Sequence, residues 1–152
     1  MEDKTIILDA SVAVKILHEE QDTTIAQDFL ETCTTNDTRV LVPEHFLYEL
    51  INVCQKLGIE VSNALKFFGA MKGSILTVVT PDNDMWLLAE QIAGEGHLKS
   101  GFPSMYDSIY HALAIESNGV FVTADRRHFA KAEKFSHISL LSGWENIFHA
   151  DK

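Results

Sequence analysis

Four carboxylates in this sequence lie within or beside short apolar segments: Asp9 in TIILDAS, Glu49 in HFLYELINVC, Asp107 in PSMYDSIYHALA and Asp125 in VFVTADRRHF. If the apolar segments are strands of one parallel sheet and the helices that follow them, these acids meet at the carboxyl ends of the strands, where open α/β folds bind ligands. Clustered carboxylates repel one another unless a cation lies between them, and Mg²⁺ or Mn²⁺ is the natural partner of oxygen ligands. The four acids therefore predict a metal-dependent active site.

Each aspartate also has a structural interpretation. Asp9 and Asp125 each follow a predicted strand and could cap the helix that begins there. Ser104 and Asp107 have the spacing of a capping box, in which the acid reaches back to the backbone of the cap residue. Glu49 is harder to explain in this way, because it lies inside an apolar helix where a buried carboxylate needs a partner. Taken together, the four acids favour the metal site.

Three polar residues lie close to these acids in the sequence and could orient them: Ser11, Asn52 and Thr123. Ser11 and Thr123 are each two residues from an aspartate, and Asn52 follows the glutamate by three residues, on the same face of the predicted helix. A hydrogen bond from such a neighbour would fix a metal ligand in place. Ordinary turn and capping chemistry is the alternative for all three.

Candidates for binding phosphate are the basic residues near the acids. Arg126 and Arg127 directly follow Asp125 and belong to the densest basic patch of the chain, and Lys15 lies on the first predicted helix. Phosphate held there would be close to the metal. The alternative is that the patch is a solvated helix face that pairs with acidic surface.

Length, charge and cysteine content narrow the class of protein. The chain has 152 residues, 46% of them hydrophobic, and no linker-like segment, which indicates one α/β domain over residues 1–152. A net charge of −10 argues against a general nucleic-acid coat protein but leaves room for a nuclease with a local basic patch. Two cysteines without metal or redox spacing, no signal peptide and no membrane-length apolar run indicate a cytoplasmic protein that does not enter the membrane.

Short strands alternate with helices along the chain, which predicts a parallel sheet covered by helices on both faces. The expected strands cover residues 4–8, 40–42, 76–79, 120–123 and 138–141. The expected helices cover residues 11–17, 23–35, 44–57, 62–71, 81–93, 104–118 and 128–134, with a terminal turn over 144–148. The pattern of apolar residues does not determine the order of the strands.

Four stretches give the chain a resemblance to a known family: LDASVAVK, EHFLYELINV, YDSIYHALAIE and VFVTADRRHF. Their order, between about Ile6 and Phe148, resembles the PIN-domain ribonucleases, and most closely the VapC-type toxins of toxin–antitoxin pairs. The resemblance implies a three-layer PIN-like fold with about five parallel strands and an RNA substrate. It also implies a separate antitoxin protein as partner, and the apolar Phe67 and Phe68 suggest a homodimer or antitoxin surface.

We therefore expect a metal-dependent endoribonuclease in which Mg²⁺ or Mn²⁺, held by the four acids, activates water for attack on a phosphodiester. The alternative is a metal-binding α/β module that does not cut, either an inactive PIN relative or a receiver-like domain. A receiver would need paired acids after the first strand and an aspartate after the third, where this sequence has Asp9 alone and Thr80-Pro81. His111 is expected in the core or at its rim, with metal ligation as the alternative. The stripe containing Tyr106 and Tyr110 is expected in the core, with a base-stacking platform as the alternative.

Overall fold

The computed structural model describes residues 4–149, which contain one five-stranded sheet in the order β3-β2-β1-β4-β5. Every pair of neighbouring strands is parallel. The strands are β1 (Thr5–Leu8), β2 (Arg39–Pro43), β3 (Leu76–Val79), β4 (Val120–Thr123) and β5 (Ile138–Leu140). The predicted α/β class, the five short strands and the parallel sheet are confirmed.

The helices are α1 (Ala10–Leu17), α2 (Thr23–Thr35), α3 (Phe46–Lys56), α4 (Val61–Lys72), α5 (Asn83–Glu95), α6 (Met105–Glu116), α7 (Arg126–Ala132) and α8 (Glu145–His149). Short 3-10 turns cover Glu133–Phe135 and Leu141–Gly143. The helix expected over 128–134 begins two residues earlier, because Asp125 caps it. Within residues 4–149, none of these helices has the length and apolar character needed to cross a membrane.

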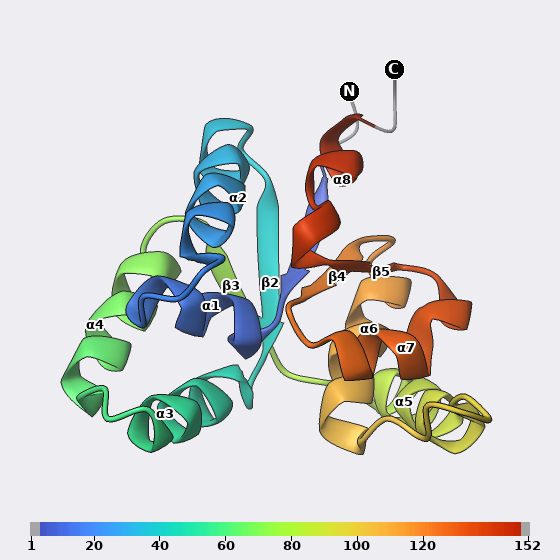
Figure 1. The fold of residues 1–152 in the computed structure, drawn as a ribbon. Helices are drawn as coiled ribbons and strands as arrows, with labels where there is room; N and C mark the ends of the chain where they lie inside the picture. Colours follow the sequence, from blue (N-terminus) through green and yellow to red (C-terminus); the bar gives the residue numbers. More distant parts are fainter. Residues whose placement is uncertain (1–3, 150–152) are drawn as a thin grey trace.

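The helices form layers on both faces of the sheet. Figure 1 shows α1 to α4 on one side and α5 to α7 on the other. Helix α6 packs against β1, β2 and β4 and is itself covered by α5. On the opposite face, Phe29 of α2 contacts the rings of Trp144 and Phe148, which joins the C-terminal segment to this layer. The predicted three-layer arrangement is confirmed.

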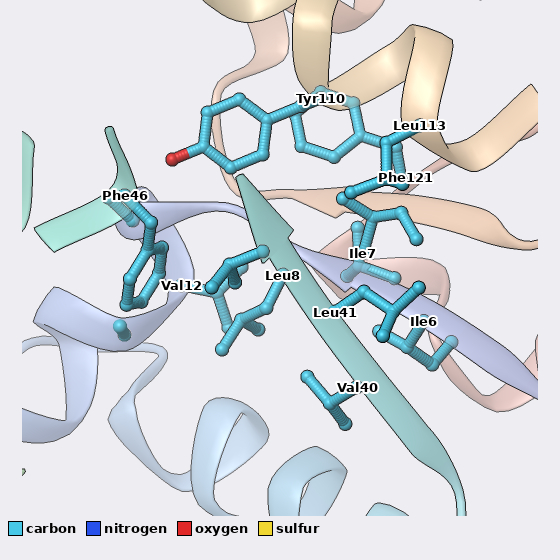
Figure 2. Close-up of a cluster of buried hydrophobic side chains, with 14 of the residues drawn as sticks. Ile6, Ile7, Leu8, Val12, Val40, Leu41, Phe46, Tyr110, Leu113 and Phe121 are labelled. Atoms are coloured by element: carbon cyan, nitrogen blue, oxygen red, sulfur yellow. The ribbon is translucent and has the colours of Figure 1, made fainter. Parts of the chain in front are cut away.

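Strand register determines which side chains reach each helix layer. Ile7 of β1 is aligned with Leu41 of β2 and with Phe121 of β4, so these three side chains share one face of the sheet. The Phe121 ring stacks on Tyr110 of α6, with ring centroids 5.2 Å apart. Figure 2 shows this cluster, with Leu113 of α6 beside it. Successive side chains of a strand point to opposite faces of the sheet. The residues before and after these three in each strand therefore fill the layer under α1 and α2.

The chain changes direction across the sheet between β1 and β4. It runs from β1 outwards through β2 to β3, returns through α5 and α6, and then adds β4 and β5 on the other side of β1. Ligands of open α/β sheets bind at the carboxyl ends of the strands that flank such a switch point. Here those ends are Leu8 of β1 and Thr123 of β4, next to Asp9 and Asp125.

A buried glycine sets the approach of α6 to β4, and its replacement should be costly. A Cβ on Gly119 would lie 2.6 Å from the backbone oxygen of Thr5, at the start of β1. We expect Gly119→Ala to lower the stability by about 1–3 kcal/mol through overpacking. Gly69→Ala on an exposed turn of α4, where a Cβ meets nothing within 4 Å, should slightly stabilise the helix instead. Thermal melts of both variants test this, and equal melting temperatures would contradict it.

Candidate active site

Asp9 lies at the centre of the switch point. Its backbone N–H donates to the Val122 oxygen at 3.1 Å, which extends the pairing of β1 with β4. Its side chain is buried, and both neighbouring hydroxyls donate to the same carboxylate oxygen: Thr123 Oγ1 at 2.6 Å and Ser11 Oγ at 2.9 Å from Oδ2. Asp9 precedes α1 but makes no side-chain capping bond to it. The carboxylate is therefore held by side chains rather than used to cap its helix.

The two hydroxyls that hold Asp9 also bind the backbone after β4. Ser11 Oγ accepts a hydrogen bond from the Ala124 N–H at 3.0 Å, and Thr123 Oγ1 accepts one from the Asp125 N–H at 3.1 Å. Each hydroxyl thus donates to one acid and accepts from the segment that leads to another. This arrangement fixes the positions of Asp9 and Asp125 relative to each other.

Asp125 begins α7. One of its oxygens, Oδ1, accepts from the backbone N–H groups of Arg127 at 2.9 Å and His128 at 3.1 Å, so the capping interpretation of the sequence holds for this residue. The side chain is exposed on its other side. An N-cap aspartate of this kind keeps a second oxygen that can bind a cation, so the two interpretations are compatible.

Asp107 lies in the first turn of α6 and is half-buried. Its backbone N–H donates to Ser104 Oγ at 3.1 Å, which confirms Ser104 as the cap of this helix. Its carboxylate Oδ2 lies 3.6 Å from Nδ1 of His128, on the neighbouring α7. The capping interaction thus comes from Ser104 and the backbone, and the carboxylate of Asp107 is directed towards the neighbouring segment.

Glu49 reaches the site from α3. Its Oε2 accepts a hydrogen bond from the Tyr110 hydroxyl at 3.1 Å, and its Oε1 lies 3.4 Å from Nε2 of His45, one helical turn earlier. The Tyr110 ring is fully buried between the sheet and α6 (Figure 2). A rigid phenol therefore orients a carboxylate that lies 61 residues away in the sequence.

The four acids influence one another electrostatically. Burial raises the pKa of Asp9, Glu49 and Asp107, and the charge of another acid adds to the effect in each case. Asp107 acts on both Asp9 and Glu49, Asp9 acts on Glu49, and Asp125 acts on Asp107. For Glu49 the pKa rises to about 7. Such mutual repulsion places the four carboxylates in one region with Asp107 as their common neighbour.

The donor set fits a hard divalent cation. The groups that face this region are carboxylate oxygens, and a cation among them would relieve the repulsion between their charges. Within residues 4–149, however, no three His, Cys, Asp or Glu side chains converge closely enough to form a complete set of metal ligands. Binding therefore needs side-chain adjustment or bridging water molecules.

Two histidines next to the acids were not identified from the sequence as residues of the site. His128, which directly follows the two arginines in the sequence, is buried, and neither of its ring nitrogens has a hydrogen-bond partner among the described residues. His45 forms part of the wall around Glu49, and its spacing of four residues before that acid was the available signal. His111 lies in the core as predicted, where burial lowers its pKa to about 4.

The remaining predicted site residues differ in their exposure and in their contacts. Asn52 is exposed and lines the same pocket as Glu49. Arg126 and Arg127 are exposed in the first turn of α7, directly after Asp125. Lys15 is engaged elsewhere, because its Nζ lies 3.0 Å from both Glu20 and Asp22. These ion pairs hold the α1–α2 connection and leave Lys15 a poor candidate for phosphate binding.

The raised pKa of Glu49 predicts a pH dependence of the metal-free protein. Between about pH 4.5 and 7 the folded state binds more protons at Glu49 than the unfolded state, so stability should fall as the pH rises through this window. The effect should be at most about 3 kcal/mol, reduced by partial exposure of the side chain. Glu49→Gln should flatten the slope, whereas Glu31→Gln on the exposed face of α2 should not. Thermal melts in EDTA from pH 4 to 8 measure the slopes, and parallel curves for all three proteins would contradict the assignment.

Comparison with protein-family models gives one match over most of the chain, to the PIN domain at residues 6–134. The chain belongs to the PIN-domain family. A comparison with curated protein sequences gave no match. The family resemblance drawn from the four sequence motifs is therefore confirmed.

Solved structures share the fold of this PIN domain. DNA-bound VapBC from Salmonella typhimurium matches with a TM-score of 0.66 at 19% identity, over 91% of this chain and 98% of that one. PAE2754 from Pyrobaculum aerophilum matches with a TM-score of 0.64 at 18% identity, over 96% and 90%. VapC20 from Mycobacterium tuberculosis, a toxin that cleaves the sarcin-ricin loop, matches with a TM-score of 0.62 at 12% identity, over 78% and 87%. The VapC-like fold is thus confirmed.

The strand order of this PIN domain also excludes the receiver-like alternative. Receivers have the flavodoxin-like order 2-1-3-4-5, in which the third strand lies beside the first. Here β3 is at the edge of the sheet, separated from β1 by β2. An acid after β3 would therefore lie away from Asp9.

Proposed function

We propose that this PIN domain is a metal-dependent endoribonuclease that hydrolyses RNA phosphodiester bonds, and that it is the toxin of a toxin–antitoxin pair. The observation that carries the proposal is the gathering of carboxylates at the switch point of the sheet, where neighbouring acids raise the pKa values of Asp9, Glu49 and Asp107 and the charge of Asp125 acts on Asp107. Carboxylates held together against their own repulsion are suited to bind Mg²⁺ or Mn²⁺. The relation to VapC structures supports RNA as the substrate.

The four acids would hold the metal, which supplies an activated water and neutralises charge on the phosphodiester. Asp9 is the most rigid of them, because Thr123 and Ser11 fix its Oδ2. Glu49 is oriented by the Tyr110 hydroxyl and approaches from the opposite helix layer. Asp107 comes from the first turn of α6 and Asp125 from the start of α7, and the scissile phosphate would lie among the four acids. Arg126 and Arg127 would hold a neighbouring phosphate.

Incubation with a mixed RNA pool tests the activity directly. Cleavage should require Mg²⁺ or Mn²⁺ and stop in EDTA. Ca²⁺ should not restore it, because the larger ion is less demanding in geometry. Cleavage that persists in EDTA would overturn the metal mechanism. Binding of metal without cleavage of RNA would indicate an inactive PIN relative. If RNA is cleaved, mapping of the new RNA ends would identify the target.

The arginine pair predicts a change in the salt dependence of RNA binding. Each phosphate contact contributes about one unit to the slope of log K against log salt. The double replacement Arg126→Ala and Arg127→Ala should therefore reduce the slope by about two units and weaken binding at low salt. Lys56→Ala together with Lys72→Ala, at the ends of α3 and α4, provides a matched loss of charge. An equal change of slope in both double variants would indicate a general effect of charge and would contradict a phosphate site at the arginines.

Partners and location are part of the same proposal. An apolar surface near the junction of α3 and α4 exposes Leu57, Val61 and Leu65, with Phe67 and Phe68 partly buried beside it. We propose that a cognate antitoxin or a second copy of the chain, in a homodimer, covers this surface. The buried free thiols of Cys33 and Cys54 suit a cytoplasmic protein. We also propose that residues 1–152 act as one domain; residues 1–3 and 150–152 lie outside the described part.

A further inference from the structure

A pocket of about 390 Å³ lies beside the acids, with Glu49 in its wall. Four of its lining residues come from α3 and the residue before it, and one comes from the first turn of α6: His45, Tyr48, Glu49, Asn52 and Tyr106. Its volume is within the range of pockets that bind small ring systems. A molecule in this pocket would touch the same carboxylate that faces the proposed metal.

Two tyrosine rings at this pocket are exposed to solvent. The exposed fractions are 75% for Tyr48 and 66% for Tyr106, whereas Tyr110, one turn later on α6, is fully buried. The sequence stripe had placed Tyr106 in the core, and the structure corrects this. Its ring lies 5.6 Å from that of His45, which in turn contacts Tyr110 at 4.9 Å. A row of rings thus leads from the core to an open aromatic surface.

The wall also offers hydrogen-bonding groups. The His45 Nε2 lies 3.0 Å from the backbone oxygen of Tyr106, and a carbonyl can only accept, so Nε2 carries the proton of this bond. Nδ1 is an acceptor in the neutral ring. Asn52 presents an exposed amide with both donors and an acceptor. Aromatic rings next to an amide are the combination that recognises heterocyclic bases.

We propose that the pocket formed by His45, Tyr48, Asn52 and Tyr106 binds one unpaired nucleobase of the RNA next to the phosphate that is cut. The base stacks on Tyr48 or Tyr106 and Asn52 contacts its polar edge. This inference rests on the proposed nuclease function and assigns a base-binding pocket to residues of this chain. Duplex RNA is disfavoured, because its bases are stacked inside the helix and do not reach such a pocket. A peptide is a poorer fit, because Glu49 in the pocket wall is one of the acids that would hold the metal at the phosphate to be cut.

Fluorescence of 2-aminopurine tests the contact without cleavage. Short single-stranded oligoribonucleotides, each with the probe at one position, are titrated with the full chain in Ca²⁺. We expect quenching at one position, and about 5- to 100-fold weaker binding for at least one of Tyr48→Ala and Tyr106→Ala, the usual range for loss of one stacked base. Tyr48→Phe and Tyr106→Phe should bind within about twofold of the unmodified protein, since they keep the ring. Leu87→Ala, which removes an equally exposed side chain from α5, should have no effect.

Three results would overturn the proposal: unchanged binding in both alanine variants, equal loss in the alanine and phenylalanine variants, or equal binding of the same oligonucleotides as duplexes. Parallel assays in Mn²⁺ keep the two proposals apart. Quenching that depends on the tyrosines in a protein that cuts no RNA would support the base pocket and overturn the nuclease. Cleavage that depends on Asp107, with binding that does not depend on Tyr48 or Tyr106, would overturn the pocket alone.

Discussion

Replacement of Asp107 by asparagine is expected to reduce RNA cleavage by about a thousandfold, with the fold intact. A metal ligand contributes several kcal/mol to the stabilisation of charge in the transition state, and each 1.36 kcal/mol corresponds to a factor of ten. Asp107 is the best choice among the acids because its charge acts on both Asp9 and Glu49, and it responds in turn to Asp125. The amide keeps the shape of the side chain and the capping bond from the backbone N–H to Ser104.

Stability separates this loss from misfolding. Burial and neighbouring charge raise the pKa of Asp107, so the fold disfavours its ionised form, and the neutral amide should leave the metal-free melting temperature unchanged or higher. Asp28→Asn on the exposed face of α2 changes the net charge equally and should keep full activity. Single-turnover cleavage in Mg²⁺ and thermal melts in EDTA supply both measurements. Substantial activity in Asp107→Asn would remove this residue from the metal site.

The elements of the fold could be predicted because their signals are local. Each strand is a short apolar run, and Ser104 was recognised as a cap from its own neighbours in the sequence. The strand order could not be predicted, because it depends on where the long return through α5 and α6 places β4. That placement is what brings Asp125 beside Asp9. A predicted helix boundary was displaced where a side chain caps the helix terminus, as Asp125 does at the start of α7.

The acids were identifiable from sequence for the same reason, since each stands out against apolar neighbours. Their surroundings were not, because the contacts that orient them connect distant segments. Tyr110 reaches Glu49 across 61 residues, and Thr123 reaches Asp9 across 114. Tyr106 was misplaced because a helical stripe is only an average over a helix, and the first turn of α6 extends beyond the packed layer. The spacing of Lys15 from Asp9 gave no sign of its ion pairs with Glu20 and Asp22.

Thr123→Val should lower both the stability of the protein and its cleavage of RNA. The Thr123 hydroxyl is fully buried, donates to Asp9 at 2.6 Å and accepts from the Asp125 N–H at 3.1 Å. Valine has the same shape but leaves a buried carboxylate and a backbone N–H without these bonds. Hydrogen bonds to charged groups contribute about 1.5–3 kcal/mol, so we expect a loss of roughly 3 kcal/mol and a melting temperature about 6–12 °C lower. Cleavage should fall by about 10- to 100-fold, because Asp9 loses its orientation.

The pH dependence of this loss identifies its cause. Thr123 lowers the pKa of Asp9 against the larger, opposite effect of burial. Without Thr123 that pKa rises further, so the variant should lose more stability relative to the unmodified protein as the pH increases. Thr123→Ser keeps the hydroxyl and removes one methyl group, which costs about 1 kcal/mol and should retain activity. Thermal melts at pH 5 and pH 8 compare the three proteins. If Thr123→Ser and Thr123→Val lose the same stability at both pH values, the loss comes from packing around Thr123 and not from its hydrogen bond to Asp9.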